Sequence, residues 1–462
     1  MLGESNVAQE NPFAVWPCLA WTQDSKWLVI ASAESEKAGR GLSLLSLATL
    51  ERKRLTTSPA GFYESTPALS PDGQTLVFTR SGSSANDIYI LRLGVNCEPQ
   101  GSPQRVFEAG AEEPFLWNVT WTSAGSEIVF SSGSYTSGSL WRMAASASAK
   151  PRRLAVTAED VGPLAVSHKG DRLAYTLCQH KMSIWRVDLS GPARNSGTPF
   201  LLRGSTRNDE APAYSPDGKR IAFQSDRSGH VEIWVCDRDG SNAAPLTSIG
   251  AIAWAPKWSP DSRSIAFVGI VEGSEDIYVV SANGGSPRRM TTDPAVDTWP
   301  SWSRDGRWIY FKSTRSGRGE IWKMPAVGGD AVQITRNDGD RPLESPEGKY
   351  LYYIKGDRYP EQCSGRKMPA GGGEETRVLD SVYCDGFWDI GEQGIYYFAK
   401  PDEKGRSEIR LHEFATGRTQ KILMLDLRYA YVALAVSPDG RTILYSQFDQ
   451  AGSDLMLVEN FR

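Results

Sequence analysis

Seven side chains suited to ligand recognition stand just ahead of a strand motif that recurs through the second half of the chain. Aromatic rings can stack on a bound group, while carboxylates and an arginine can form charge-assisted hydrogen bonds with it. Placed around one axial opening, such residues predict a mouth that binds a protein, a peptide or a small polar ligand. The seven residues are Glu210, Trp254, Trp299, Asp340, Arg341, Asp385 and Trp388.

Packing offers an alternative role for some of these rings. Trp254, Trp299 and Trp388 would cap the core of their repeats if no ligand touched them. Trp258 and Trp302 each precede a turn serine by one residue, so we expect them to lie in that core. For two basic loop residues a structural role in a turn is favoured over ligand contact, namely Arg227 and Arg315.

The sequence contains none of the common catalytic signatures. It lacks a Gly-x-Ser-x-Gly elbow, a phosphate-binding Gly-x-x-x-x-Gly-Lys loop and a His-Glu-x-x-His helix motif. The six cysteines form no Cys-x-x-Cys pair, and only four histidines are present, which argues against a zinc site. We therefore predict a protein that is not an enzyme and has no cofactor or metal. Cys363 and Cys384 lie in successive repeats and could meet.

The element that positions the seven residues is a strand–turn–strand unit. In Pro212–Ser225 (PAYSPDGKRIAFQS), the Ser-Pro-Asp-Gly segment has the residues of a tight turn between two strands. A third apolar strand and a short Leu-Thr segment follow each turn, which gives four strands per repeat. Variants of the unit occur at Pro67–Arg80, Pro256–Gly269, Pro300–Ser313 and Leu434–Gln447.

Four strands per repeat is typical of a β-propeller blade, so we predict an all-β fold of tandem propellers. The turns recur roughly 42 to 52 residues apart, within the range of four-stranded blades. They give ten repeats, whose markers are Thr22, Ser70, Thr122, Ser167, Ser215, Ser259, Ser303, Ser345, Asp389 and Ser437.

Ten blades exceed the usual size of one ring, so the chain is expected to divide. Residues 197–462 are predicted to form a six-bladed propeller. Its last repeat ends after the third strand, Leu455–Val458, and Phe200–Leu202 is predicted to supply the missing fourth strand as a clasp. Residues 1–196 hold four repeats. Either Asn6–Trp16 completes a small ring there, or the blades form an open arc whose missing members lie outside this chain.

Charge and hydropathy exclude two classes of partner. The formal net charge is −4, with 51 basic against 55 acidic residues, so direct nucleic-acid binding by this chain is not expected. The apolar runs are too short to span a bilayer, so no membrane segment is expected. The N-terminus shows no secretory signal pattern. A chain that is complete as written would be cytoplasmic.

The repeat resembles that of TolB-type β-propellers. The resemblance rests on Ser-Pro-Asp-Gly, a following Ile-Ala-Phe, then Ile-Trp-Val or Ile-Tyr-Val, and the Leu-Thr segment. The variants at Ser225–Asn242, Ser301–Gly317, Glu344–Gly356 and Ser453–Arg462 are most similar to the propeller half of bacterial membrane-integrated winged-helix transcriptional regulators. The winged helix and the membrane helix of that family are missing from this sequence.

These resemblances imply a periplasmic or extracytoplasmic protein. The favoured function is that of a non-enzymatic ligand- or protein-binding propeller, the sensor or interaction half of a signalling assembly. Two alternatives stay open. One is the accessory propeller of a prolyl-oligopeptidase-type peptide hydrolase, and the other is a TolB-like envelope scaffold.

Overall fold

The protein is all-β, as the repeat pattern predicts. A computed structural model gives, within the described ranges, strands β1 to β38 and the short 3-10 turn η2 (Val95–Cys97). No helix within the described ranges is long and apolar enough to cross a membrane. The structure describes residues 19–32, 41–59, 62–81, 86–108, 115–134, 137–147, 149–155, 161–190, 195–271, 273–358, 362–384, 387–404, 406–426 and 433–461.

The chain forms two compact units. Unit 1 comprises Met1–Gln179 and Ala451–Arg462, and unit 2 comprises His180–Gln450. These bounds differ from the expected division after residue 196. The reason is that two long strands, β14 (Arg172–Ser190) and β38 (Thr442–Glu459), each contribute residues to a blade in both units.

Unit 2 is a ring of six blades. Five blades are regular four-stranded antiparallel sheets. Each innermost strand contacts the innermost strand of the next blade, and β37 contacts β17, which closes the circle. The strands of the five blades are β17 (Asp209–Tyr214), β18 (Arg220–Ser225), β19 (Glu232–Asp237), β20 (Ala244–Pro245); β21 (Ile252–Trp258), β22 (Ser264–Val271), β23 (Ser274–Ser281), β24 (Arg288–Arg289); β25 (Asp297–Trp302), β26 (Trp308–Ser313), β27 (Glu320–Pro325), β28 (Val332–Gln333); β29 (Asp340–Glu344), β30 (Tyr350–Arg358), β31 (Gln362–Pro369), β32 (Thr376–Val382); and β33 (Trp388–Gly391), β34 (Gly394–Phe398), β35 (Arg406–Glu413), β36 (Thr419–Asp426).

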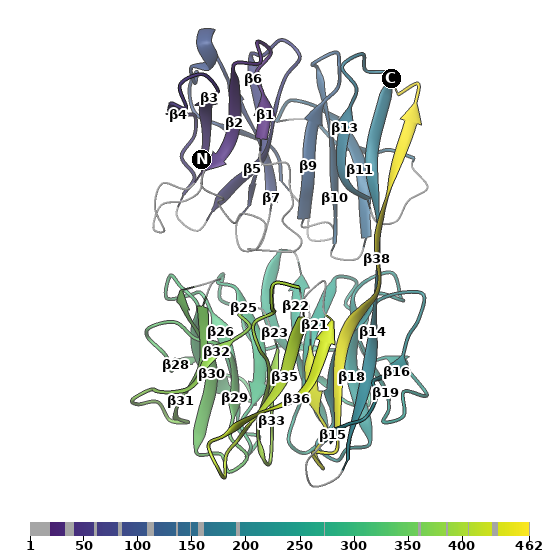
Figure 1. Cartoon of the computed structure of the whole chain (residues 1–462), viewed down its shortest axis with the longest axis vertical. Coiled ribbons are helices and arrows are strands. Elements are labelled where there is room, and N and C mark those ends of the chain that lie inside the picture. Colours follow the sequence, from purple (N-terminus) through teal and green to yellow (C-terminus); the bar gives the residue numbers. More distant parts are fainter. Residues whose placement is uncertain are drawn as a thin grey trace. The chain divides into compact units, whose positions relative to one another are not determined.

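The sixth blade combines both ends of unit 2. Strand β37 (Leu434–Val436) pairs with the first part of β38, and β16 (Phe200–Arg203) pairs with the second part of β14. Strands β38 (yellow) and β14 (teal) run side by side in Figure 1, and Leu189 N–H donates to the Arg441 carbonyl at 2.7 Å. Phe200–Leu202 thus lies in the last blade, as predicted. Its partner strand is β14, whereas the sequence suggested Leu455–Val458 as the partner. The short β15 (Asn195–Ser196) also pairs with β14.

Unit 1 contains the other four blades, so ten repeats are present as predicted. Its innermost strands β1, β5, β9 and β13 contact one another in succession. The residues Asn6–Trp16 lie outside the described ranges. In the fourth blade, Phe461 N–H from the segment after β38 donates to the Asp171 carbonyl at 2.9 Å. The strands are β1 (Leu19–Trp21), β2 (Trp27–Ser32), β3 (Gly41–Ser46), β4 (Arg52–Arg54); β5 (Tyr63–Leu69), β6 (Thr75–Ser81), β7 (Asn86–Arg92), β8 (Gln104–Phe107); β9 (Phe115–Trp121), β10 (Glu127–Ser134), β11 (Ser137–Ala144), β12 (Arg152–Arg153); and β13 (Val161–Val166) with parts of β14 and β38.

The turn between the first two strands of a blade is built by its own side chains. In the Ser215 turn, the serine Oγ donates to Asp217 Oδ1 at 2.6 Å and accepts from Arg220 N–H at 2.9 Å. Gly218 has a φ of 69°, the left-handed conformation that favours glycine. These contacts are local, so the Ser-Pro-Asp-Gly pattern specifies the turn, and Asp217 N–H adds a hydrogen bond to Ser262 Oγ of the next blade at 3.1 Å.

Tryptophans join neighbouring blades. Trp258 Nε1–H donates to the Ala213 carbonyl of the preceding blade at 3.0 Å, and Trp302 Nε1–H donates to the Lys257 carbonyl at 3.1 Å. Trp258 is buried and Trp302 is partly buried. Both therefore have the packing role expected of them.

Candidate functional site

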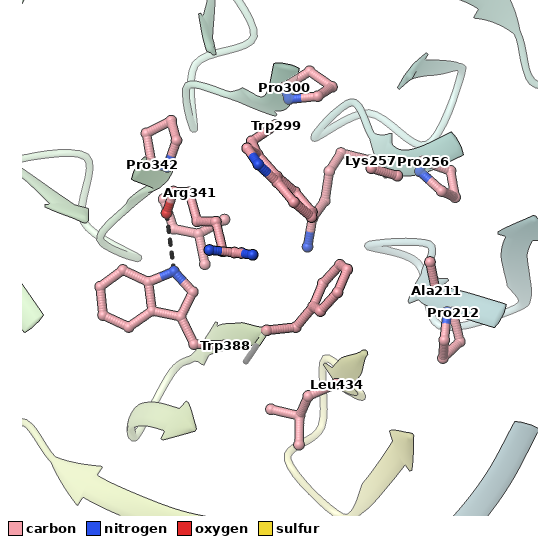
Figure 2. Close-up of a pocket in the computed structure, with 13 residues that line it drawn as sticks. Ala211, Pro212, Pro256, Lys257, Trp299, Pro300, Arg341, Pro342, Trp388 and Leu434 are labelled. Atoms are coloured by element: carbon pink, nitrogen blue, oxygen red, sulfur yellow. Dashed lines mark hydrogen bonds between the residues drawn. The ribbon is translucent and has the colours of Figure 1, made fainter. Parts of the chain in front are cut away.

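A pocket lies where the innermost strands of unit 2 converge (Figure 2). All six blades contribute to it, through residues of the innermost strand or the residue just before that strand. Four prolines and three aromatic rings make the lining largely apolar. The lining residues are Ala211, Pro212, Ala255, Pro256, Lys257, Trp299, Pro300, Arg341, Pro342, Leu343, Phe387, Trp388 and Leu434.

A β-bulge directs these residues toward the pocket. In four successive blades the strand register shifts at a residue that precedes proline and has a positive φ. An extra residue in one strand bends it and re-aims its side chain. A left-handed conformation in a non-glycine residue costs about 1 to 3 kcal/mol. The four residues are Ala211 (φ 49°), Ala255 (φ 53°), Trp299 (φ 55°) and Arg341 (φ 49°).

The bulge itself belongs to the blade, because unit 1 has it too. Thr66 precedes Pro67, has a φ of 49° and lies at a register shift in β5. What distinguishes the pocket is the side chain that each bulge presents. Two blades place only a methyl group there, whereas Trp299 and Arg341 fill the same position in the next two. The pocket is therefore lined by small residues on one side and by large ones on the other.

Arg341 lies between two aromatic rings. Its guanidinium carbon is 4.2 Å from the centroid of Trp299 and 5.7 Å from that of Phe387. Trp299 makes edge contacts with Phe387 at 5.0 Å and with Trp254 at 4.9 Å between centroids. Such cation–π and edge-to-face contacts hold the guanidinium and the rings in fixed orientations.

Hydrogen bonds fix one end of the same arginine. Arg341 Nη1–H donates to the Cys384 carbonyl at 3.0 Å and lies 3.4 Å from Asp340 Oδ2. Trp388 Nε1–H donates to the Arg341 carbonyl at 2.9 Å, the dashed line in Figure 2. Arg341 Nε is buried and has no hydrogen-bond partner within the described ranges.

A disulfide anchors the wall that carries the rings. Cys363 in β31 is bonded to Cys384, with 5.2 Å between their Cα atoms. Cys384 precedes Phe387 and Trp388 by only a few residues, and its carbonyl receives the Arg341 hydrogen bond. The cross-link therefore ties the fourth blade to the segment that begins the fifth.

The structure brings most of the predicted site residues together. Trp299, Arg341 and Trp388 line the pocket. Trp254 contacts the ring of Trp299, and Asp340 is the neighbour of Arg341. Glu210 accepts a hydrogen bond from Gln224 Nε2 at 3.2 Å. Asp385 lies outside the described residues.

The two acidic residues have opposite pKa shifts. Burial raises the pKa of Glu210 to about 8, with a further contribution from the Asp226 carboxylate. Burial would also raise the pKa of Asp340, but the positive charges of Lys312 and Arg341 outweigh it and lower that pKa. Lys312 Nζ lies 2.9 Å from Asp340 Oδ2. At neutral pH Asp340 is thus ionised and paired, whereas Glu210 is largely protonated.

Sequence reasoning named three of the thirteen lining residues, and Phe387, Lys257 and Leu434 are among those that it missed. Phe387 is adjacent to Trp388 in a repeat whose turn sequence is degraded. Only the tryptophan of this pair was predicted to bind a ligand. Lys257 and Leu434 belong to the strand motif itself and look like ordinary strand residues. The residue before each repeat's first proline would have located Ala211, Ala255, Trp299 and Arg341, but not Lys257, Phe387 or Leu434.

The two basic loop residues have the structural role favoured from the sequence. Arg227 forms an ion pair with the buried Asp209, and Arg315 Nη2 lies 2.7 Å from the buried Asp297 Oδ2. Each guanidinium also lies over a tryptophan of its own blade, 4.8 Å from the Trp234 centroid and 4.9 Å from that of Trp322. Both arginines therefore link the strands of one blade rather than facing the pocket.

Comparison with known proteins agrees with this architecture. Residues 246–385 match the family model of the TolB beta propeller domain. This part of the chain is similar to that domain. The Tol-Pal system protein TolB of Anaeromyxobacter dehalogenans is 44% identical over 59 residues, which cover 13% of this chain and 14% of that relative's length. The match thus spans a small part of the curated relative.

One solved structure shows the same fold over a longer stretch. A structure assigned to TolB from Agrobacterium tumefaciens has 21% sequence identity and a TM-score of 0.50, and covers 59% of this chain and 99% of that one. TolB from Acinetobacter baumannii covers 73% of this chain and 81% of its own, with 16% identity and a TM-score of 0.43. The likeness to winged-helix regulators stays a prediction from the sequence.

Proposed function

We propose that unit 2 is a non-enzymatic binding module that holds a protein, peptide or small ligand at its axial pocket. The observation that carries the proposal is the pair of strained bulges that present Trp299 and Arg341, where neighbouring blades present alanine. A large residue in a strained conformation that lines an opening is more often used for recognition than for packing. Recognition also explains why Arg341 Nε is buried without a partner in the described chain.

In this proposal the chain is the sensor or interaction half of a larger signalling assembly, in the periplasm or another extracytoplasmic compartment. The disulfide between Cys363 and Cys384 supports that compartment, because disulfides persist in oxidising surroundings. The similarity of residues 246–385 to the TolB propeller supports a binding role without identifying the partner.

A pull-down with Trp299→Ala tests the function. The variant should lose the partners that the wild-type chain retains, because Trp299 contacts both Arg341 and Phe387 at the pocket. Trp308→Ala is a matched control, since Trp308 begins β26 at the end opposite the pocket. Melting temperatures show whether each variant keeps its fold. Bound peptides should be recovered intact by mass spectrometry, whereas cleavage would favour the peptidase alternative. If a folded Trp299→Ala variant kept every wild-type partner, the pocket would be structural.

A further inference from the structure

The charged side chains among the described residues of the pocket lining are both positive. They are Lys257 and Arg341, and no aspartate or glutamate is among the described lining residues. Lys257 forms no ion pair within the part of the chain that the structure describes. The nearby Asp340 is already paired with Lys312, and Glu210 is largely protonated at neutral pH. The lining therefore favours an anion.

Arg341 presents one edge of its guanidinium without a partner. Nη1 is used by the Cys384 carbonyl and by Asp340, while Nε and Nη2 form no hydrogen bond with described residues. Nε and Nη2 lie on the same edge of the planar group, so their N–H bonds are parallel. Two parallel donors match the two oxygens of a carboxylate, and such bidentate pairs are stronger and more specific than single bonds. The rings of Trp299 and Phe387 hold this edge in place before a ligand arrives.

Lys257 reaches the same space from another blade. Figure 2 shows its amino group and the Arg341 guanidinium both pointing into the opening between the rings. A carboxylate there would meet two cations, and the group that carries it would meet Trp299, Phe387 and Leu434. Apolar walls with a few placed charges are the usual composition of a small-ligand site.

Resting on the proposed binding function, we propose that the axial pocket takes a carboxylate carried on an apolar group, with Arg341 and Lys257 binding the carboxylate. The carboxylate could come from the C-terminus of a peptide or from a free organic acid. Both sources share this chemistry, and the probes below distinguish them.

Two matched pairs of probes test the proposal on the full chain. The first pair is N-acetyl-glycyl-phenylalanine and its C-terminal amide. The second pair is indole-3-acetate and indole-3-acetamide. Binding is measured by isothermal titration calorimetry or by ligand-observed NMR. At least one acid should bind, and its amide should bind about tenfold more weakly or worse, because the amide loses a charge-assisted bidentate contact.

Variants assign the contact to the two cations. Arg341→Gln should weaken binding of the acid by about tenfold to a hundredfold. Arg341→Lys should retain part of the affinity, because lysine keeps the positive charge but lacks the two parallel N–H donors of the guanidinium. Lys257→Gln should cause a smaller loss and, being partly exposed, should leave the fold intact. Arg307→Gln is the control, an arginine whose side chain is 78% exposed in the Ser303 turn. Melting temperatures accompany each measurement.

The outcomes separate the two proposals. Binding of only the peptide acid, or of only indole-3-acetate, identifies the source of the carboxylate. Equal binding of acid and amide, or unchanged acid binding in both Arg341→Gln and Lys257→Gln, overturns the carboxylate proposal. So does a failure of both acids to bind at millimolar concentration while the pull-down still depends on Trp299. In that last case the binding function stands. If neither acid bound and the pull-down also did not depend on Trp299, the binding function would be rejected as well.

Discussion

The structure predicts that residues 180–450, and not 197–462, are the fragment that folds as a closed ring. The third strand of the last blade comes from β14, whose second part buries Met182, Ile184, Val187 and Leu189. Burying a side chain of this size contributes about 1.5 to 3 kcal/mol, so the four together contribute roughly 6 to 12 kcal/mol as an upper estimate. A domain is stable by only about 5 to 15 kcal/mol in total. Removing this strand should therefore abolish cooperative folding.

Urea and thermal unfolding of purified fragments, followed by circular dichroism, make the comparison. Fragment 180–450 should unfold in one cooperative transition, and fragment 180–462 is the control that keeps every residue of both candidate third strands. Fragment 197–462 should give a broad transition of low amplitude. If it unfolded as cooperatively and at the same temperature as 180–450, another segment, such as Leu455–Val458, would be able to replace β14, and the assignment would fail.

Two further predictions concern the surroundings of the pocket. Reducing the Cys363–Cys384 disulfide, which closes a loop of 21 residues, should lower the free energy of unfolding by about 3 kcal/mol. A Cys363→Ala, Cys384→Ala variant should be less stable than the oxidised wild type and should not respond to reductant. Equal melting temperatures of the wild type with and without reductant would contradict this prediction. Burial raises the pKa of Glu210 from an ordinary value of 4.5 to about 8, so the folded state binds the carboxyl proton more tightly than the unfolded state does. The stability that comes from this proton is therefore lost as the pH rises from about 4.5 to about 8. Melting temperatures at about pH 5 and about pH 9 should differ less in Glu210→Gln than in wild type, and an unchanged difference would show that Glu210 is not the titrating group.

The parts of the fold that could be predicted from the sequence are those with local causes. The Ser215 turn is made by Ser215, Asp217 and Gly218 within a few residues, so its pattern could be recognised wherever it recurs. The choice of strand partner is different. Ile184–Arg186 and Leu455–Val458 both have the pattern of a third strand, and each fits either of two blades. The blade that each strand joins is determined by the pairing of strands across the whole unit, and a local sequence pattern does not contain this information.

The site shows the same division. Trp299, Arg341 and Trp388 were recognisable because bulky groups stand where a turn needs small ones. The bulge that aims Trp299 and Arg341 was not predictable, since a residue before proline is usually extended rather than left-handed. The separation of Lys257 from the acidic residues was not predictable either, because it depends on which side chains meet across blades.

The closure of unit 2 has a consequence for the order in which the ring can form during synthesis. Trp185 Nε1 and Asp449 Oδ1, 264 positions apart, are hydrogen-bonded across the last blade at 2.8 Å. At translation rates of about 5 to 20 residues per second, roughly 13 to 50 s separate the emergence of these two residues from the ribosome. For all of that time the edge of β14 that will receive β38 has no strand to pair with. An unpaired edge of this kind invites pairing with other chains, so we expect this stage of synthesis to depend most on chaperones.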